Sequence, residues 1–397
     1  MSEMAKKANL DVVRENNRKL VLQTLFNADK TSRSSISKLV GLQKSTVSSI
    51  FLDLEAEGFV QELGIGESSN VGGRKPSMIR FNRQYGYVLA FDFGVRHLRY
   101  TLNHLSGETI RDGAIAIKSK QVGPVFEEMK KIIDTIAIPD TINGLVGIAI
   151  AVHAPVFNNQ IIYSPFFDFD AFDLVGELEK LTDVPVIMEN EANLAAIFYR
   201  DYHVYDETIE YQDFISLNIH NGIGVGIICN GQIFRGVNGL AGEVGRTIMF
   251  DPKSSLTAGE PLPRLEDLYS ENAIISRVAA NKQIPHLSRK AFLDLLREKD
   301  SSVMPLMAEW QIAIATFIYN LNQLYAPQAI FISSRIFDNF PEITQATLTI
   351  VDELDSVHKP DLIISDSSVH DASMLGGVAL ISRKILGLSD YVLTFSL

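Results

Sequence analysis

Two short motifs contain residue types that could hold a phosphate group. Asp92 and Gly94 end a predicted strand over residues 87–94, and a carboxylate beside glycine at such a turn can bind Mg²⁺ together with a phosphate. Further along the chain, one predicted turn has glycine at every second position: Gly222, Gly224 and Gly226. Glycine lets a backbone approach a ligand closely, but a tight β-turn also needs glycine for its own geometry. Both interpretations of this second turn stay open.

A third motif contains residue types that suit nucleic acid. It lies in a polar loop over residues 66–76, between predicted strands over residues 59–64 and 77–82. The loop tip combines small and basic residues: Gly72, Gly73, Arg74 and Lys75. Glycines allow close approach to a groove, and an arginine can enter a narrow minor groove. The alternative is a flexible linker whose charges only keep the chain soluble.

Three predicted helices precede this loop, over residues 17–26, 32–40 and 44–57. Each has an apolar stripe at helical spacing. Gly41 and Gly58 follow the second and third helices, where glycine tolerates the left-handed backbone that ends a helix. This order is typical of a helix–turn–helix. The third helix begins with side chains that can reach base edges and phosphates in a major groove: Gln43, Lys44, Ser45, Thr46 and Ser48.

A solvated helix without a ligand could carry the same polar residues. The two strands and their loop complete a winged helix, however, and this order favours DNA contact. The charge distribution agrees: residues 1–82 carry twelve basic and nine acidic side chains, a net +3, whereas the rest carries 24 and 39, a net −15. We therefore predict a DNA-binding domain over residues 1–82 and a second domain over residues 83–397.

The composition excludes several other classes of protein. The 397-residue chain has a net charge of −12 and no apolar run of 18 residues, so we expect neither a membrane span nor general nucleic-acid binding by the whole chain. The N-terminus is polar and no apolar signal segment follows it, which indicates a cytoplasmic location. Cys229 is the one cysteine, so a disulfide framework and a multi-cysteine zinc site are excluded. We expect it to be buried in a strand.

The second domain alternates predicted strands and helices, and two similar β-rich openings predict an α/β fold of two lobes around a cleft. Its predicted strands cover residues 87–94, 98–105, 109–117, 145–152, 186–188 and 328–333, and residues 213–228 contain another strand followed by the glycine-spaced turn. Its predicted helices cover residues 124–136, 172–181, 307–325 and 372–385.

These motifs, in this order, resemble the ROK family (repressors, open reading frames and kinases) along nearly the whole chain. The repressor branch, with its XylR-, NagC- and Mlc-type regulators, is the nearest match. The segments that carry the resemblance cover residues 72–76, 92–94, 189–193, 222–226, 235–245 and 265–266. The resemblance implies a winged helix–turn–helix followed by a two-lobed, actin-like (ribonuclease H-like) sugar-kinase fold. It also implies a cleft that binds a sugar and, in the kinases, ATP.

By position in the family, polar side chains should converge on the hydroxyls of a sugar or sugar-phosphate effector: Asn190, Glu191, Glu243 and Glu266. Arg246 could bind a hydroxyl or a phosphate, or it could pair with Glu243, three residues earlier. His153 is also a candidate contact, although a buried, hydrogen-bonded structural histidine is the interpretation that we favour. Residues 164–169 are either an aromatic lid or a loop packed onto its lobe.

The family kinases use an aspartate as the catalytic base where this chain has Glu191, and the extra methylene would misplace the carboxylate. Their phosphate turn has a second glycine, a threonine and a lysine, but here Val95, Arg96 and His97 follow Gly94. Ser333, Ser334 and Arg335 stand where a glycine cluster contacts the nucleotide. Arg246 replaces a zinc-binding histidine. We therefore expect no kinase activity, no cofactor and no metal.

The leading hypothesis is a sugar-responsive transcriptional repressor of carbohydrate utilisation genes, with a xylose-like effector. Such repressors bind palindromic operator DNA as dimers or higher homo-oligomers. One alternative is a sugar kinase with an appended DNA-binding head, and another is a dimeric architectural protein with a vestigial cleft. The sequence leaves the sugar, its phosphorylation and the operator sequence open.

Overall fold

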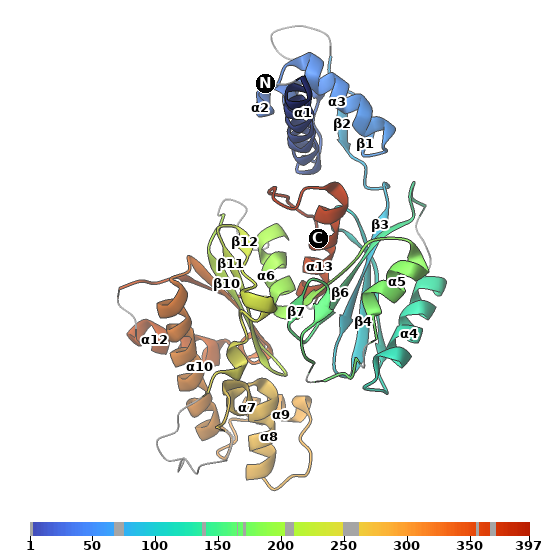
Figure 1. Cartoon of the computed structure of the whole chain (residues 1–397). Coiled ribbons are helices and arrows are strands. Elements are labelled where there is room, and N and C mark those ends of the chain that lie inside the picture. The colour runs from blue at the N-terminus through green and yellow to red at the C-terminus, as the bar shows by residue number, and fades with distance from the viewer. Residues whose placement is uncertain are drawn as a thin grey trace.

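A computed structural model describes residues 3–66, 75–136, 140–164, 166–169, 172–202, 210–248, 262–354, 357–365 and 371–397. It places a small N-terminal head above a body of two lobes that lie side by side (Figure 1). The head contains the first three helices and the first two strands. Each lobe is built on one five-stranded sheet.

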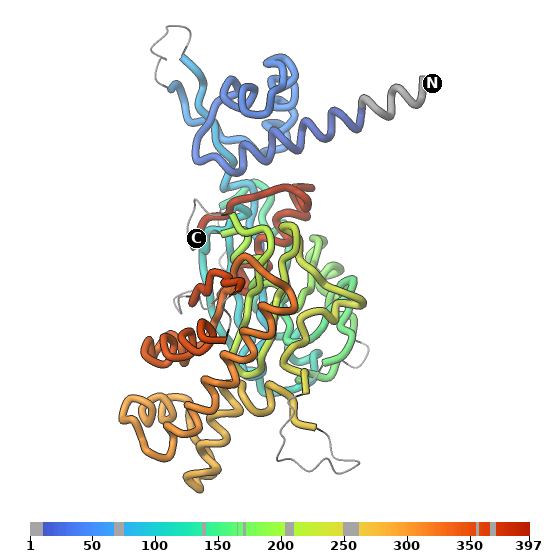
Figure 2. Tube along the Cα trace, turned by 90° about the vertical axis from the view of Figure 1, so that its left-hand side faces the viewer, coloured from blue at the N-terminus to red at the C-terminus, as the bar shows by residue number. Residues whose placement is uncertain are grey.

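The head is a winged helix. Its elements are α1 (Glu3–Phe26), α2 (Arg33–Val40), α3 (Lys44–Ala56), β1 (Val60–Ile65) and β2 (Ser77–Phe81). Gly41 and Gly58 follow α2 and α3 with φ of 68° and 88°, as the sequence predicts. The prediction that the first helix begins at residue 17 is wrong: α1 begins at Glu3. Figure 2 shows the coloured part of α1 extending outward from the rest of the head.

The first lobe has the strand order β5-β4-β3-β6-β9. Its strands are β3 (Tyr87–Phe93), β4 (His97–His104), β5 (Thr109–Ala116), β6 (Leu145–Val152) and β9 (Val186–Asn190). Helices α4 (Val122–Thr135) and α5 (Leu174–Thr182) pack on one face of this sheet. A short hairpin, β7 (Val156–Phe157) and β8 (Gln160–Ile161), follows β6.

The second lobe has the strand order β12-β11-β10-β13-β14. Its strands are β10 (Phe214–Ile219), β11 (Ile223–Cys229), β12 (Gln232–Ile233), β13 (Ala329–Ser334) and β14 (Asp361–Ile364). Its helices are α7 (Leu265–Tyr269), α8 (Glu271–Asn281), α9 (Arg289–Arg297), α10 (Met304–Tyr325), α11 (Arg335–Asn339) and α12 (Pro341–Leu354), with 3₁₀ turns at Val237–Gly239 and Val244–Arg246. Cys229 ends β11 and is exposed, so the prediction of a buried cysteine is wrong.

Two helices lie between the sheets and join the lobes: α6 (Glu191–Tyr202) and α13 (Ala372–Leu386). They pack closely because Gly376 has no side chain, and a Cβ atom there would lie 1.8 Å from the Leu194 carbonyl oxygen. On the other side of α6, the Tyr199 ring stacks on Phe331 of β13, with 4.6 Å between the ring centroids. Helix α6 therefore contacts both halves of the body.

The residues that the structure describes contain neither a membrane-spanning helix nor a cluster of metal ligands. Among these residues, no helix has both the length and the apolar character to cross a bilayer. The described histidine, cysteine and carboxylate side chains also form no group of three that could hold a metal ion. Residues 249–261, which cover most of the family's zinc region, lie outside the described part of the chain.

Candidate functional site

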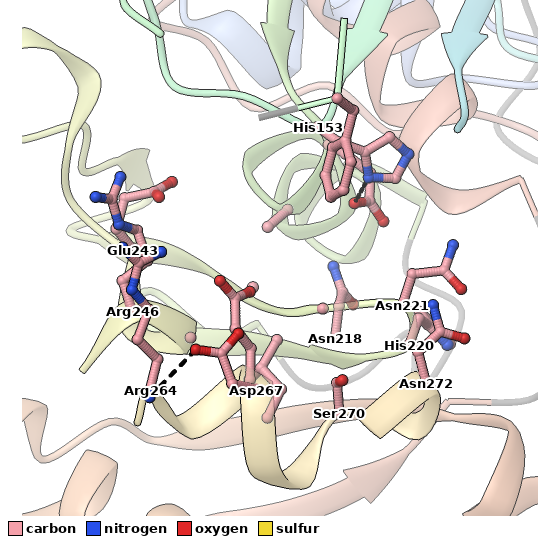
Figure 3. Close-up of a pocket in the computed structure, with 18 of the residues that line it drawn as sticks. His153, Asn218, His220, Asn221, Glu243, Arg246, Arg264, Asp267, Ser270 and Asn272 are labelled. Carbon is pink, nitrogen blue, oxygen red and sulfur yellow. Dashed lines mark hydrogen bonds and ion pairs between the residues drawn. The ribbon is translucent and has the colours of Figure 1, made fainter. Parts of the chain in front are cut away.

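A cleft of about 740 Å³ opens between the two lobes. The first lobe contributes His153, Tyr163 and the start of α6, and the second contributes the β10–β11 turn, the segment around Glu243, and helices α7 and α8. In Figure 3 these side chains face one another across the cleft, with His153 on one side and Ser270 and Asp267 on the other. A pocket of this size accommodates a small organic ligand.

The junction between β9 and α6 positions the first group of site residues. Asn190 caps the helix, because its Oδ1 atom accepts hydrogen bonds from the backbone N–H groups of Ala192 (2.9 Å) and Asn193 (3.3 Å). Its Nδ2 atom donates to the Ala154 carbonyl at 3.1 Å. Asn190 therefore fixes the start of α6, and Glu191, in the first turn of that helix, places a carboxylate in the cleft wall.

His153 joins two carboxylates at the floor of the cleft. Its Nδ1 atom lies 2.8 Å from Glu191 Oε2, and its Nε2 atom lies 3.5 Å from Asp92 Oδ1. Burial alone would lower the pKa of His153, but the two carboxylates raise that pKa well above its ordinary value. His153 is therefore an imidazolium at neutral pH, and it is both a structural residue and part of the cleft lining.

Asp92 is held by a second cation. Arg99 Nε donates to Asp92 Oδ2 at 3.1 Å, and Arg99 Nη1 lies 3.2 Å from Asp371 Oδ1. Burial would raise the pKa of Asp92, but His153 and Arg99 lower it to about 2. Burial would likewise raise the pKa of Glu191, and the His153 charge instead lowers it. Asp92 and Glu191 are therefore ionised at neutral pH and already have cationic partners.

Tyr163 links the lobes on the opposite side of the cleft. Its hydroxyl donates to Glu243 Oε2 at 2.6 Å, and the Arg246 guanidinium lies 4.6 Å above its ring. Such a cation–π contact is a typical role for arginine beside an exposed aromatic ring. The main neighbour of both Glu243 and Arg246 is thus Tyr163, which the sequence alone does not indicate.

The prediction of a turn over the three spaced glycines is wrong beyond Gly222, because Gly224 and Gly226 lie within strand β11 and pair with β10. A Cβ atom on Gly222 would lie 2.9 Å from Glu266 Oε2, and one on Gly226 would lie 2.2 Å from the Ala192 carbonyl oxygen. Glycine is therefore required for packing at Gly226, where the neighbour is backbone, whereas a side chain at Gly222 would meet only the movable end of Glu266. Glu266 is half-buried, and burial raises its pKa. It lines the cleft together with Asp267, and its contact with an effector stays a prediction.

A polar cluster lies at the carboxyl ends of β10 and β13. The sequence alone singles out neither His220 nor Glu271, which belong to it. His220 Nε2 lies 3.0 Å from Ser333 Oγ. Glu271 is buried, and its Oε1 atom accepts hydrogen bonds from Ser334 Oγ (3.2 Å) and the backbone N–H of Arg335 (2.7 Å). Asn218 lies on β10, and His220 is the first residue after that strand, so the alternation of strand side chains could have placed the two on one face.

The predicted DNA contacts lie on the head, far along the chain from the cleft. Gln43, Lys44 and Ser45 are exposed at the start of α3, whereas Thr46 and Ser48 are partly buried. Lys75 is exposed beside β2, but Gly73 and Arg74 lie outside the described residues. The described polar residues at the start of α3 thus form one solvent-facing surface, and the wing tip stays a prediction.

Solved structures share this fold, one of them over nearly the whole chain and another over three quarters of it. A crystal structure of a ROK family transcriptional regulator, homolog of the E. coli MLC protein, superimposes with a TM-score of 0.78 over 95% of this chain and 98% of that one, at 21% identity. A ROK family glucokinase from Streptomyces griseus, in complex with glucose and AMPPNP, matches 75% of this chain and all of its own with a TM-score of 0.60 at 17% identity. The fold is thus a two-lobed kinase body with a winged helix in front of it.

The chain belongs to the ROK family, whose sequence model matches residues 88–384. A xylose repressor from Lactiplantibacillus pentosus is 38% identical over 386 residues, which cover 96% of each chain. A xylose repressor from Staphylococcus xylosus is 31% identical, over 94% of this chain and 96% of its own. Similarity at this level and over this length includes the head as well as the body.

Proposed function

We propose that this protein is a sugar-responsive DNA-binding transcriptional repressor, with xylose or a closely related aldose as its effector. The observation that carries this proposal is the match to xylose repressors over 96% of the chain, from the winged helix to the last helix of the body. The head supplies a DNA-reading helix, and the cleft supplies polar side chains that suit a sugar. The choice of xylose as the effector rests on the names of the relatives, which are xylose repressors.

Lost kinase chemistry supports a regulator rather than an enzyme. A kinase needs a free base and a carboxylate that can bind Mg²⁺ with phosphate. Here His153 lies against Glu191, and Arg99 and His153 neutralise Asp92. Val95, with its branched side chain, lines the cleft in place of a glycine. Asp92 and Glu191, the two carboxylates of these motifs, therefore both form ion pairs with His153.

The side of the cleft where a kinase binds its nucleotide also carries different residues in this chain. In a kinase of this fold, glycines at the ends of β10 and β13 leave room for ATP. In this chain, His220 bridges to Ser333 across those strand ends, and the Glu271 carboxylate accepts the first N–H groups of α11. The Glu271 carboxylate thus already accepts the N–H group that a nucleotide phosphate could otherwise bind at this strand end. We infer that the cleft takes a neutral sugar without ATP.

On the sugar side, Glu191, Glu243 and Glu266 are the acceptors we assign to effector hydroxyls, with Arg246 as a donor. Asn190 acts through its helix cap rather than through direct contact. On the DNA side, we assign Gln43, Lys44 and Ser45 to the major groove and Arg74 to the minor groove. Two heads of a homodimer or larger homo-oligomer would read the halves of a palindromic operator.

Operator binding in the presence of sugars tests this proposal. Purified protein is titrated with DNA from upstream of its own gene at fixed salt, with xylose, glucose, arabinose or xylose phosphate as the added compound. We expect sequence-selective binding that xylose weakens. Glu243→Gln should reduce the xylose effect without changing binding in the absence of sugar. Sugar-dependent ATP consumption that Glu191→Gln abolishes would instead identify a kinase.

A further inference from the structure

The last residues of the chain lie between the head and the body (Figure 1). We name residues 388–397 the C-terminal strap. The Val392 carbonyl accepts hydrogen bonds from Gln23 Nε2 (2.9 Å) and Asn27 Nδ2 (3.0 Å), at the end of α1. The Asn27 Oδ1 atom in turn accepts the Thr394 backbone N–H at 3.0 Å. The strap thus holds the head through three hydrogen bonds to two side chains.

The same strap is attached to the end of α6. The Phe395 backbone N–H donates to the Asp201 carbonyl at 2.9 Å. The Phe395 ring is buried and contacts both sides, with its centroid 5.1 Å from the Phe26 ring of the head and 5.5 Å from the Tyr202 ring of α6. One continuous apolar cluster therefore extends from the head core, through the strap, to α6.

A buried ion pair fixes the base of the strap. Arg383 of α13 is 4% exposed, and its guanidinium donates to both carboxylate oxygens of Asp201, at 2.9 and 2.7 Å. The same guanidinium also donates to the carbonyl oxygens of Leu388 and Tyr391 at the start of the strap. Because Asp201 is itself 1% exposed, this contact holds the strap and the end of α6 together.

The other end of α6 lies in the cleft. Its first residue is Glu191, and its twelve residues correspond to a length of about 18 Å. Strand β11 of the second lobe packs directly on the first turn of α6. This close approach is possible because Gly226 has no side chain, and a Cβ atom there would collide with the Ala192 carbonyl oxygen. A change in lobe arrangement that moves β11 therefore moves α6, and a well-packed helix transmits that displacement along its axis.

We propose that α6 and the C-terminal strap carry the sugar signal from the cleft to the DNA-binding head. The inference rests on the proposed function and assigns its regulation to a defined path. Sugar at Glu191 shifts α6, Asp201 and Tyr202 move with it, and the strap changes the position of α1 through Gln23 and Asn27. The competing path is the covalent linker after β2, where Phe59 stacks on Tyr85 with 4.3 Å between the ring centroids.

A double variant, Gln23→Ala with Asn27→Ala, tests this path because it removes the hydrogen bonds between strap and head and leaves the cleft unchanged. Asn16→Ala is the matched control, since Asn16 is exposed on the same helix. The measured quantity is the ratio of operator dissociation constants with and without xylose. We expect the ratio of the double variant to fall at least about fivefold below wild type, with xylose affinity within about twofold. The control should keep the wild-type ratio.

A shortened chain that ends at Tyr391 provides an independent second variant. It keeps the Arg383 contacts to Leu388 and Tyr391 but lacks the residues that reach the head. It should bind xylose and lose the operator response in the same way. A wild-type ratio in either variant would overturn the strap proposal and assign the signal to the linker. A wild-type protein whose operator binding no sugar changes would contradict the proposed function, and the strap proposal with it.

Discussion

Replacing His153 with leucine should destabilise the first lobe, because this cation separates two ionised carboxylates. Asp92 is 3% exposed at its side chain, whereas His153 and Glu191 are 25% and 26% exposed. Breaking a fully buried ion pair costs about 3–5 kcal/mol. Partial exposure of two partners reduces this cost, so we expect a loss of about 2–3 kcal/mol in the free energy of unfolding at pH 7. His97→Leu is the control, since His97 is exposed on β4.

The pH dependence of this loss identifies its electrostatic origin. The raised pKa of His153 contributes stability that is fully present below the unfolded value of 6.5 and is lost as pH rises through the folded pKa. The pKa of Asp92, lowered from 3.8 to about 2, contributes stability that is present above 3.8 and is lost as pH falls toward 2. The difference between wild type and His153→Leu should therefore be largest between about pH 4 and 6.5, decline slowly above that range, and shrink near pH 3.

Urea unfolding, followed by circular dichroism at pH 7, 5.5 and 3, measures both effects. The linear dependence on urea gives a free energy for each protein at each pH. A loss below about 1 kcal/mol at pH 7 would refute the assignment of His153 as a buried cation. A loss of the expected size that is the same at pH 3 would refute the electrostatic cause and indicate packing instead.

Three further substitutions test the head, the strap and the cleft. Lys44→Ala should weaken operator binding and lower the slope of its salt dependence by about one ion, while Lys290→Ala on the distant α9 should change neither. Arg383→Met should lower the free energy of unfolding by about 3 kcal/mol, because it leaves the buried Asp201 carboxylate with Arg200 as its cationic partner. An unchanged Tm would contradict the assigned ion pair. Tyr163→Phe keeps the ring beneath Arg246 but removes the donor to a carboxylate, so xylose affinity in calorimetry should fall about three- to tenfold, and equal affinity would exclude this orienting role.

Local signals in the sequence predicted the head and much of the body. Glycines mark the ends of α2 and α3, and Ser32 caps α2 by accepting the Ser35 N–H. The start of α1 was missed because residues 3–16 show no apolar stripe, and such a helix has no periodic signal. Helix α9 was also missed, although Phe292 and Leu296 lie four residues apart on its buried face.

The predicted site residues needed tertiary structure to acquire their roles. Asn190 has the residue type of a sugar contact, but only the β9–α6 junction shows it as a helix cap. His153 was expected to be hydrogen-bonded, yet its partners come from β3 and α6, which are distant in sequence. Cys229 was misjudged because it follows an apolar strand, whereas the strand ends there in an exposed turn. Contacts between side chains of separate helices and strands produce no periodic signal in a single sequence, so they could not be predicted.

Thermodynamic linkage between xylose and operator DNA tests the central claim most directly. Isothermal titration gives the xylose affinity of the free protein and of its operator complex at the same salt concentration. The account predicts weaker xylose binding in the complex, by the same factor by which xylose weakens operator binding, because coupling between two sites is reciprocal. Equal xylose affinity in both states, or no xylose binding at all, would contradict a xylose-responsive repressor.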